Sequence, residues 1–408
     1  MIKISSKNKT IYGSIDLESS KSISNRLLII KELCKTKFRI QNLSNAKDTK
    51  ILNELLDGFN KRIDLNCEDA GTALRFLIAF LATKDGIWKV SGSKRMHERP
   101  VKPLIDCLKE LGAEIKYLEK EGFPPVEIKS KKLKSKKLSL PGDISSQFIS
   151  ALLMIAPKLE NGIHLEIVSE VLSKPYVKMT LELMSEFGIN YNWKNNLIKI
   201  EKQSYNGKKM VVENDWSAAS FWYSFVALSK TAKIEIPKLN KSSIQGDSIL
   251  SEIFSTLGVK TSFKKNSIIL SRNSKSVKEL NLDLSNYPDL GLPLIVTCSG
   301  LGIKAHLKGL KNLQIKESKR LEVIQKELKK FNINTQIDNS SISIKENQKI
   351  EQPNSNIDCH NDHRIPMSIA PLSMKINSIS FKDKNVVNKS YPDFWKDLEV
   401  AGINCVNS

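Results

Sequence analysis

One pattern recurs six times along the 408-residue chain: an amphipathic helix, a stop that is usually glycine, and an alternating, strand-like segment. In each copy, apolar residues at i, i+3, i+4 and i+7 predict the helix, and the stop predicts a left-handed helix end. The stops are Gly58, Gly112, Gly188, Gly258, Asn332 and Gly402. The copies are residues 51–63, 103–117, 179–193, 249–263, 323–337 and 394–406.

The even spacing of these copies constrains the fold. Six copies in 408 residues give about 68 residues per copy, which leaves room for two helices and several strands but is too long for a short-repeat solenoid. A unit that mixes helices and strands predicts helices packed against mixed sheets. We therefore expect an α/β protein with two globular halves, each built from three copies.

The chain is strongly basic, with 64 Lys and Arg residues against 44 Asp and Glu and a formal charge of +20. A polyanionic partner such as nucleic acid is one interpretation, and a compositional excess of lysine is the other. Only nine of the basic residues are arginine, the side chain that supplies bidentate and stacking contacts to nucleic acids. We therefore favour the lysine excess, and we predict that the densest run, residues 129–138, is a solvated hairpin.

The sequence indicates neither a membrane nor a secretory location. No apolar run approaches the roughly 20 residues that span a bilayer, and the N-terminal MIKISSKNKT lacks an apolar signal segment. The six cysteines form no CxxC pair, which predicts reduced thiols in a cytoplasmic protein. They are Cys34, Cys67, Cys107, Cys298, Cys359 and Cys405.

Two small polar stretches lead into apolar helices and could bind anions. They are SSKSISNR (19–26) and EDAGTALRFLIAFLA (68–82), in which Gly71 would let backbone amides approach a ligand closely. The start of a helix offers unpaired N–H groups and the positive end of the helix dipole. A plain capped helix start fits either stretch equally well, with Asp69 or Thr72 as the expected cap of the second.

Two more stretches carry groups that recognise anions or hydroxyls. Arg95 and Arg99 lie in the turn-like GSKRMHERPVKPL (92–104), and because arginine binds carboxylate and phosphate groups in bidentate geometry, we predict a clamp there. The serines and glutamine of LPGDISSQFISALLMIAP (140–157) are neutral donors at another helix start. This stretch is also consistent with simple helix capping.

The C-terminal half adds a second group of charged stretches. Lys316 and Arg320 are four residues apart on one expected helical face, where like charges are unfavourable unless an anion lies between them. CHNDHRIPMSIA (359–370) contains possible metal ligands, but their spacing is too compressed for a usual zinc site. We therefore expect no metal, and we predict substrate contact by Asp362 and Arg364.

A candidate general base precedes one of the apolar helices. Asp289 follows a proline in a turn within SNYPDLGLP (285–293). A carboxylate at such a position can accept a proton from a substrate if the fold places it inside a cleft.

Together these stretches resemble the 5-enolpyruvylshikimate-3-phosphate synthase family, in the order of the family's motifs and over nearly the whole chain. Each match is weakly specific alone, whereas ten in register are very specific. The matching stretches are SKSISNR, DAGTALR, RMHERP, SSQFISALLM, SKPY, SIQGD, the PD at 288–289, KESKRL, NDHR and the late lysine motif NVVNKSYPDFW.

The resemblance implies a fold, a cellular location and an oligomeric state. The implied fold is a two-domain inside-out α/β barrel in which each domain holds three βαβαββ repeats. Residues 1–16 with 216–408 would form the first domain and residues 17–215 the second, with the active site in the cleft between them. The implied protein is a cytoplasmic monomer without cofactor, metal, nucleic-acid partner or membrane partner.

The resemblance also implies a reaction, the transfer of the enolpyruvyl group of phosphoenolpyruvate to the 5-hydroxyl of shikimate 3-phosphate with release of phosphate. The implied catalytic residues are Lys21, Asp289, Glu317 and His363. The implied ligands of shikimate 3-phosphate are Lys21, Ser22, Arg26, Ser145, Ser146, Gln147, Ser173, Tyr176, Asp289, Asn312 and Lys316. Those of phosphoenolpyruvate are Lys21, Gly71, Arg99, Gln147, Arg320, Arg364 and Lys389.

One residue departs from the family pattern, and two alternative functions stay open. Asp69 stands where the best-known members of the family have asparagine.

A UDP-N-acetylglucosamine enolpyruvyl transferase would share the fold and the donor, but it typically has a reactive cysteine on a mobile loop, whereas Cys107 is expected inside a helix. An RNA- or anion-binding protein, the more distant alternative, would use the net charge of +20.

Overall fold

The computed structural model describes residues 1–129, 131–134, 137–273 and 275–407. The chain forms two compact units. The first unit comprises Met1–Ser20 and Glu213–Ser408, and the second comprises Lys21–Val212. The chain therefore enters the second unit once and returns once, so the first unit contains both the beginning and the end of the chain.

The second unit combines helices with short strands. Its helices are α1 (Lys21–Leu33), α2 (Lys47–Gly58), α3 (Gly71–Leu81), α4 (Lys102–Glu110), α5 (Ser146–Ile155) and α6 (Lys174–Glu186). Its strands are β3 (Ile40–Gln41), β4 (Asp64–Asn66), β5 (Ile87–Ser91), β6 (Glu114–Tyr117), β7 (Val126–Lys129), β8 (Lys137–Leu140), β9 (Ile163–Ile167), β10 (Asn192–Lys194), β11 (Leu197–Ile200) and β12 (Met210–Val211). Short 3-10 helices are η1 (Phe59–Lys61), η2 (Met96–Glu98) and η3 (Ala156–Lys158).

The first unit has the same mixture. Its helices are α7 (Trp216–Leu228), α8 (Leu250–Thr256), α9 (Gly291–Leu301), α10 (Arg320–Lys329), α11 (Arg364–Ile369) and α12 (Phe394–Val400). Its strands are β1 (Ile2–Ser5), β2 (Thr10–Ser14), β13 (Thr231–Pro237), β14 (Val259–Phe263), β15 (Ser267–Arg272), β16 (Glu279–Asp283), β17 (Lys304–Lys308), β18 (Thr335–Ile337), β19 (Ile342–Ile344), β20 (Ser378–Phe381) and β21 (Asn404–Asn407). Its 3-10 helices are η4 (Gly246–Ile249), η5 (Pro288–Leu290), η6 (Lys311–Ile315), η7 (Ala370–Met374) and η8 (Asn385–Lys389).

Four sheets share one topology. Their strand orders are β4-β5-β7-β6, β8-β9-β11-β10, β2-β13-β15-β14 and β16-β17-β19-β18. In each, the first two strands are parallel and the remaining pairs are antiparallel. Each parallel pair is joined through a helix that crosses between its strands or, for β2 and β13, by a longer path through the second unit. The common topology shows that these sheets are copies of one structural unit.

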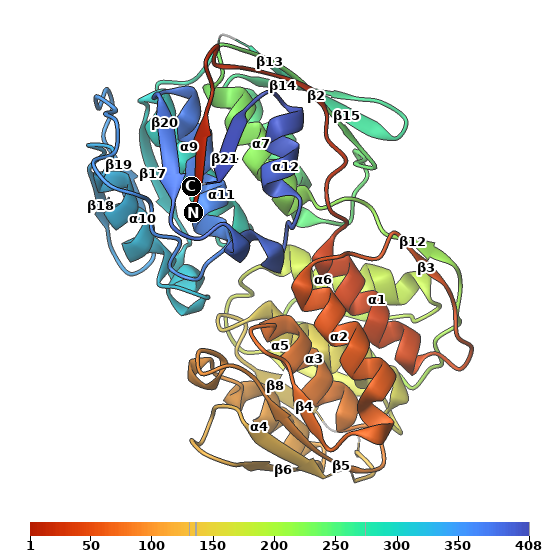
Figure 1. The fold of residues 1–408 in the computed structure, drawn as a ribbon. Helices are drawn as coiled ribbons and strands as arrows, with labels where there is room; N and C mark the ends of the chain where they lie inside the picture. Colours follow the sequence, from red (N-terminus) through yellow and green to blue (C-terminus); the bar gives the residue numbers. More distant parts are fainter. Residues whose placement is uncertain (130, 135–136, 274, 408) are drawn as a thin grey trace. The chain divides into compact units, whose positions relative to one another are not determined.

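The N-terminal strands complete two sheets of the first unit. β2 lies parallel to β13, and β1 lies between β20 and β21, antiparallel to both. Figure 1 shows the two chain ends next to each other on this three-stranded sheet. The second unit has, besides its two four-stranded sheets, the short parallel pair β12-β3. Residues 1–20 therefore belong to the first unit because their strands pair there.

Helices fill the interior of each unit, and the sheets lie outside them. α3, α5, α7 and α9 are buried on nearly every side, and α3 packs on α5 as α7 packs on α9. The strands instead alternate buried and exposed residues, as in β13. A helix that is apolar all round requires burial, whereas an alternating strand can leave one face in water. This hydrophobic pattern explains why the helices are inside.

The predicted left-handed helix ends are confirmed at five of the six stops. Gly112, Gly188, Gly258, Asn332 and Gly402 all have positive φ. The prediction is wrong at Gly58, where φ is −111° and the chain continues into the 3-10 helix η1. Because this copy keeps turning as a helix, it needs no left-handed residue there, and the following strand, β4, begins only at Asp64.

The predicted hairpin at residues 129–138 is wrong. β7 ends at Lys129 and β8 begins at Lys137, but the two strands belong to different sheets. The segment between them is a connection from one repeat to the next, and its Leu133 is buried. Residues 130, 135 and 136 of the run lie outside the described part of the chain.

The described cysteines are all free thiols. No described helix is long and apolar enough to cross a bilayer.

A buried polar chain links α7 to α12 in the first unit. Trp222 of α7 donates to the Tyr391 hydroxyl at 3.1 Å, and Tyr391 donates to Asp397 of α12 at 2.6 Å. Burial raises the pKa of Asp397 to about 6, although the Tyr391 hydrogen bond opposes this effect. The folded protein thus holds this proton at pH values where the unfolded chain has lost it.

This proton makes the stability of the protein depend on pH. As pH rises from about 4 to about 6, the unfolded state loses the Asp397 proton first, so the free energy of unfolding should fall. Asp397→Asn should remove on the order of 1 kcal/mol of this fall, as measured by urea unfolding at both ends of the range. The exposed Asp85, which is not among the groups that shift the pKa of Asp397, provides the control, Asp85→Asn. An unchanged pH profile in Asp397→Asn would contradict the account.

Candidate functional site

The first unit contains a buried arginine held by three carboxylates. The side chain of Arg320 is 2 % exposed. Its Nε and Nη2 donate to the two oxygens of Asp362 at 2.8 and 3.2 Å, and Nη2 also donates to Glu317 at 2.7 Å. Asp289 lies 3.8 Å from Nη1. Burial alone would lower the pKa of Arg320, but Asp362 and Glu317 outweigh it, so the pKa is raised. The guanidinium therefore stays charged.

Two further cations continue this arrangement. Lys389 lies 3.2 Å from Glu317, and Arg364 lies 3.3 Å from Asp289 and also donates to its backbone carbonyl at 2.9 Å. The order Lys389, Glu317, Arg320, Asp289, Arg364 is a row of alternating charges, which we call the charge row. Its cations can bind anionic groups, and its carboxylates can accept or donate protons.

The charge row comes from segments far apart in the sequence. Arg320 and Arg364 are the first residues of α10 and α11, Asp289 lies in η5 just before α9, and Lys389 ends η8. Helix starts can accommodate such residues because their backbone N–H groups are not used within the helix. Arg364 shows this directly, since its N–H donates to Asp362 at 3.1 Å.

Asp362 has a different place from the one predicted. Its side chain is fully buried, and it accepts hydrogen bonds from Arg320, from Ser318 at 3.0 Å and from the Arg364 N–H. The predicted substrate contact by Asp362 is therefore wrong, because its oxygens are taken up in orienting the two arginines. Arg364 itself is only partly buried.

A second buried carboxylate lies behind Asp289. Asp247 accepts a hydrogen bond from the Ser217 hydroxyl at the start of α7. Burial raises the pKa of Asp247 to about 7, and the charge of Asp289 adds to the shift, while Ser217 and Arg364 oppose it. An adjacent carboxylate that keeps its proton to near neutral pH limits the negative charge around Asp289.

The other predicted residues of the first unit lie around this row. His363 is buried and directly precedes α11, with its Nδ1 3.8 Å from Asp362. Asn312 is nearly buried in η6. Lys316 follows η6 and α10 begins only at Arg320. The prediction that Lys316 and Arg320 share one helical face is therefore wrong.

The possible metal ligands of residues 359–363 point to different partners. The Cys359 thiol donates to the Asp383 carbonyl, and the His360 ring lies 2.9 Å from Glu327. Asp362 is bound to Arg320 as described above. Among the described residues, no group of three or more His, Cys, Asp or Glu side chains could hold a metal ion.

In the second unit, Lys21 begins α1 and is paired with a buried carboxylate. Its Nζ lies 3.1 Å from Asp48, in the first turn of α2. The Asp48 side chain is 6 % exposed and that of Lys21 is 21 % exposed. Asp48 thereby fixes the Lys21 ammonium at the surface of the unit. The sequence does not single out Asp48, because nothing in its own stretch separates it from an ordinary first-turn acid.

Arg26 lies in the interior of the second unit. It donates to the hydroxyls of Thr180 and Ser150 at 2.6 and 3.2 Å, and to the carbonyls of Ser22 and Tyr176 at 2.8 and 3.2 Å. Burial lowers its pKa to about 10. These bonds tie α1 to α5 and α6, so in this structure Arg26 positions the backbone around Ser22 and Tyr176.

A second network surrounds Gly71, the first residue of α3. A Cβ on Gly71 would lie 2.5 Å from Nη1 of the buried Arg99, so only glycine lets this guanidinium come so close. Arg75 donates to Gln147 at 2.7 Å, and Gln147 donates to Thr72 at 3.0 Å. These bonds hold the starts of α3 and α5 together.

The predicted serine and tyrosine ligands lie at helix starts of the same unit. Ser145 caps α5 by accepting from the Gln147 N–H at 3.3 Å, and Ser146 is the first residue of α5. Ser173 precedes α6 with a left-handed φ of 57°, and Tyr176 lies in the first turn. Ser22 is the second residue of α1.

Two predictions for this unit are wrong. α3 has Ala70 at its N-cap position without a side-chain cap, and Asp69 instead accepts from Ser93. Arg95 and Arg99 do not form one clamp, because Arg95 pairs with the exposed Glu98 at 2.6 Å whereas Arg99 lies against Gly71. The nearest sequence signal for the second correction is the i, i+3 spacing of Arg95 and Glu98.

Comparison with known proteins gives a consistent result. Residues 58–398 match the family described as EPSP synthase (3-phosphoshikimate 1-carboxyvinyltransferase). A 3-phosphoshikimate 1-carboxyvinyltransferase from Bacteroides fragilis is 41% identical over 394 residues, covering 96% of both chains. One from Haemophilus influenzae is 30% identical over 419 residues, covering 95% of this chain and 96% of the other.

A solved structure of an EPSP synthase from Acinetobacter baumannii has a similar fold, with a TM-score of 0.81 and 19% sequence identity, covering 100% of this chain and 99% of that one. The structural likeness confirms the expected fold class. The extent of the sequence match shows that the chain belongs to the EPSP synthase (3-phosphoshikimate 1-carboxyvinyltransferase) family.

The burial of Arg320 generates a stability prediction. Asp362→Asn removes the anion that binds two nitrogens of the guanidinium, and the uncompensated buried charge should lower the free energy of unfolding by about 3 kcal/mol. Asp64→Asn, which removes a solvent-exposed pairing with Lys89, is the control and should cost less than about 1 kcal/mol. Chemical denaturation measures both, and equal losses would contradict a special role of Asp362.

Proposed function

We propose that the chain transfers the enolpyruvyl group of phosphoenolpyruvate to the 5-hydroxyl of shikimate 3-phosphate and releases phosphate. The observation that carries this proposal is the 41% identity to a 3-phosphoshikimate 1-carboxyvinyltransferase over 96% of the chain. The proposal includes a cytoplasmic location and a monomeric state. It also includes the expectation that the two units contribute to one active site.

The charges of the substrates support this function. Both substrates carry a phosphate group, and each carries a carboxylate, so the site needs fixed cations. The first unit offers Arg320, Arg364 and Lys389, and the second offers Lys21 and Arg99. In the proposed assignment these five cations bind phosphoenolpyruvate, together with Gly71 and Gln147.

Shikimate 3-phosphate is proposed to bind mainly to neutral groups with a few charged ones. Hydroxyl and amide side chains suit a ring rich in hydroxyls. The proposed ligands are Lys21, Ser22, Arg26, Ser145, Ser146, Gln147, Ser173, Tyr176, Asp289, Asn312 and Lys316. Arg26 is the least direct of these, because its hydrogen bonds lie within the second unit.

The addition step needs a base and an acid, and the proposed pair lies on one row. Asp289 takes the proton of the 5-hydroxyl while that oxygen bonds to C2 of phosphoenolpyruvate. Glu317 gives a proton to the methylene carbon, which yields a tetrahedral intermediate. Both carboxylates contact Arg320. The charge of this guanidinium therefore acts on both proton transfers, the one to Asp289 and the one from Glu317.

The elimination step reverses the proton movement at carbon. Glu317 removes a proton from the new methyl group, the carbon–carbon double bond forms again, and the C2–phosphate oxygen bond breaks. Lys21 is proposed to stabilise or protonate the departing phosphate, and its fixed position follows from the ion pair with Asp48. His363 lies next to Asp362 and is proposed to assist in the same region.

Substrate anions should change the protonation of Glu317. Without substrate, Lys389 and Arg320 are its partners and stabilise its ionised form. A phosphate or carboxylate group bound to these cations would take over part of their charge and allow Glu317 to hold a proton. The substrate thereby creates the acid that the reaction needs.

The alternative reaction, with UDP-N-acetylglucosamine as the acceptor, receives no support from the cysteines. Cys107 lies buried in α4, and burial raises the pKa of its thiol to about 12, helped by the charges of Glu110 and Asp106. A thiol of this kind is poorly ionised and poorly nucleophilic.

A phosphate-release assay tests the function directly. Release should require both phosphoenolpyruvate and shikimate 3-phosphate and should proceed without added metal or nucleotide. Activity with UDP-N-acetylglucosamine as the acceptor in place of shikimate 3-phosphate, or release from phosphoenolpyruvate alone, would contradict the proposal.

The roles of the two carboxylates give a second prediction. Asp289→Asn and Glu317→Gln should each lower kcat by about 10²- to 10⁴-fold, because each removes a general acid or base. Glu322→Gln on α10, which removes an exposed partner of Lys319, is the matched control and should keep kcat within about twofold. Near-normal turnover in either of the first two variants would overturn the assigned role.

A further inference from the structure

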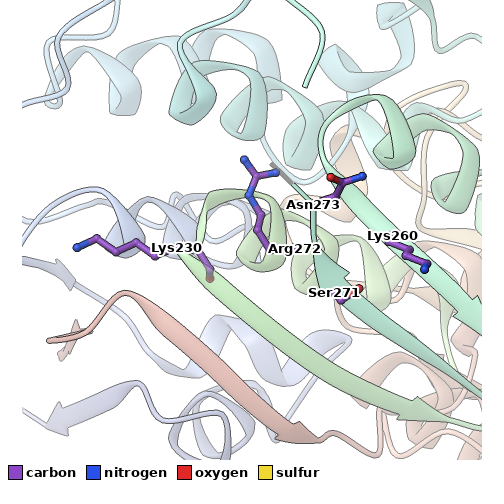
Figure 2. A pocket seen from close by; sticks show the side chains of 6 residues that line it. Lys230, Lys260, Ser271, Arg272 and Asn273 are labelled. Atoms are coloured by element: carbon purple, nitrogen blue, oxygen red, sulfur yellow. The ribbon is translucent and has the colours of Figure 1, made fainter. Parts of the chain in front are cut away.

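A basic hollow lies at one end of the sheet β2-β13-β15-β14 in the first unit. It has a volume of about 790 Å³ and is lined by Ser229, Lys230, Lys260, Ser271, Arg272 and Asn273. None of these described lining residues is acidic or aromatic. Figure 2 shows the guanidinium of Arg272 and the amide of Asn273 on the same side of the strand, while the side chains of Lys230 and Lys260 extend away from them in opposite directions.

The backbone between α8 and β14 fixes Arg272. Its Nη1 donates to the carbonyls of Leu257 and Gly258 at 3.2 and 2.8 Å. A Cβ on Gly258, whose φ is +81°, would lie 2.0 Å from this nitrogen, so glycine is required for the close approach. The Gly258 carbonyl also accepts from the Asn273 N–H at 2.8 Å. The hollow therefore has one immobile cation, unlike a surface covered only by flexible lysines.

The cations of the hollow lack the carboxylate partners that lysines have elsewhere on the sheets. On the same sheet, Lys264 lies 3.7 Å from Glu235, and on the neighbouring one Lys304 lies 3.1 Å from Glu279. Among the described residues, none of Lys230, Lys260 and Arg272 makes an ion pair.

Two further lysines are affected by the cations of the hollow. The pKa of Lys9 is lowered by burial and by the charge of Lys230, and the pKa of Lys375 is lowered by burial and by the charge of Arg272. Burial also lowers the pKa of Arg272 itself. Like charges held together in this way are unfavourable until an anion lies between them.

We propose that this hollow binds a small, multiply charged, phosphate-bearing molecule at a site separate from the charge row. Arginine and lysine supply the charge, and the Asn273 amide supplies a neutral donor for phosphate oxygens. The volume matches a small-molecule site. The lack of a lining aromatic residue disfavours a stacked base, and therefore a nucleic acid.

The test titrates the full chain with inorganic tripolyphosphate by calorimetry. Lys230→Ala with Lys260→Ala should weaken the binding event at the hollow about tenfold. The charge-matched control replaces Lys326 and Lys329, two lysines exposed on α10 that do not line the hollow, and it should change this event less than about twofold. An equal loss in both double variants would overturn the proposal, because it would show a general effect of net charge.

Two further arms separate the hollow from other anion sites. The cations of the charge row also attract tripolyphosphate, so Arg364→Gln should lose binding there and keep the binding of tripolyphosphate at the hollow, whether or not the proposed reaction is correct.

Full retention of binding in the Lys230→Ala, Lys260→Ala variant would overturn the proposal. Single-stranded RNA whose affinity for the hollow rises with length, beyond that of tripolyphosphate, would also overturn it in favour of a polynucleotide.

Discussion

The buried guanidinium of Arg320 is the interaction on which the first unit's site depends. A charge removed from water is costly, and only close, hydrogen-bonded counter-charges offset that cost. Asp362 supplies the structural part of this compensation from a fully buried position. Glu317 and Asp289 supply the rest from less buried positions. The same ion pairs that keep Arg320 charged therefore fix two potentially reactive carboxylates next to it.

This arrangement relates stability to function. Asp289 lies in the 3-10 helix η5 and Glu317 in the connection between η6 and α10, and the fold brings these segments together at Arg320. In the second unit, Asp48 likewise fixes Lys21 through an ion pair, and the missing side chain of Gly71 lets the Arg99 guanidinium approach closely. In the proposed reaction, substrate anions replace protein carboxylates as partners of the cations. Folding has already ordered these charged groups, so substrate binding does not bear the free-energy cost of ordering them.

The sequence predicted the features that depend on local patterns. The six-fold repeat, five left-handed helix ends and the turn carrying Asp289 follow from hydrophobic period and glycine placement. Several failures arose where partners distant in the sequence decide the outcome. Asp362 turned out to orient Arg320, and the lysine-rich stretch at 129–138 connects two sheets. Asp48 was missed because its partner is 27 residues away, a distance no local pattern encodes.

The central claim is that a bound anion takes over the charge partners of Glu317. Its most direct test is a ¹³C NMR titration of the Glu317 carboxyl group, assigned with Glu317→Gln and recorded with and without saturating inorganic phosphate. The account predicts that phosphate shifts the protonation of Glu317 to higher pH, because Arg320 and Lys389 then neutralise the phosphate. Identical titration curves, with phosphate binding demonstrated in the same sample, would contradict it.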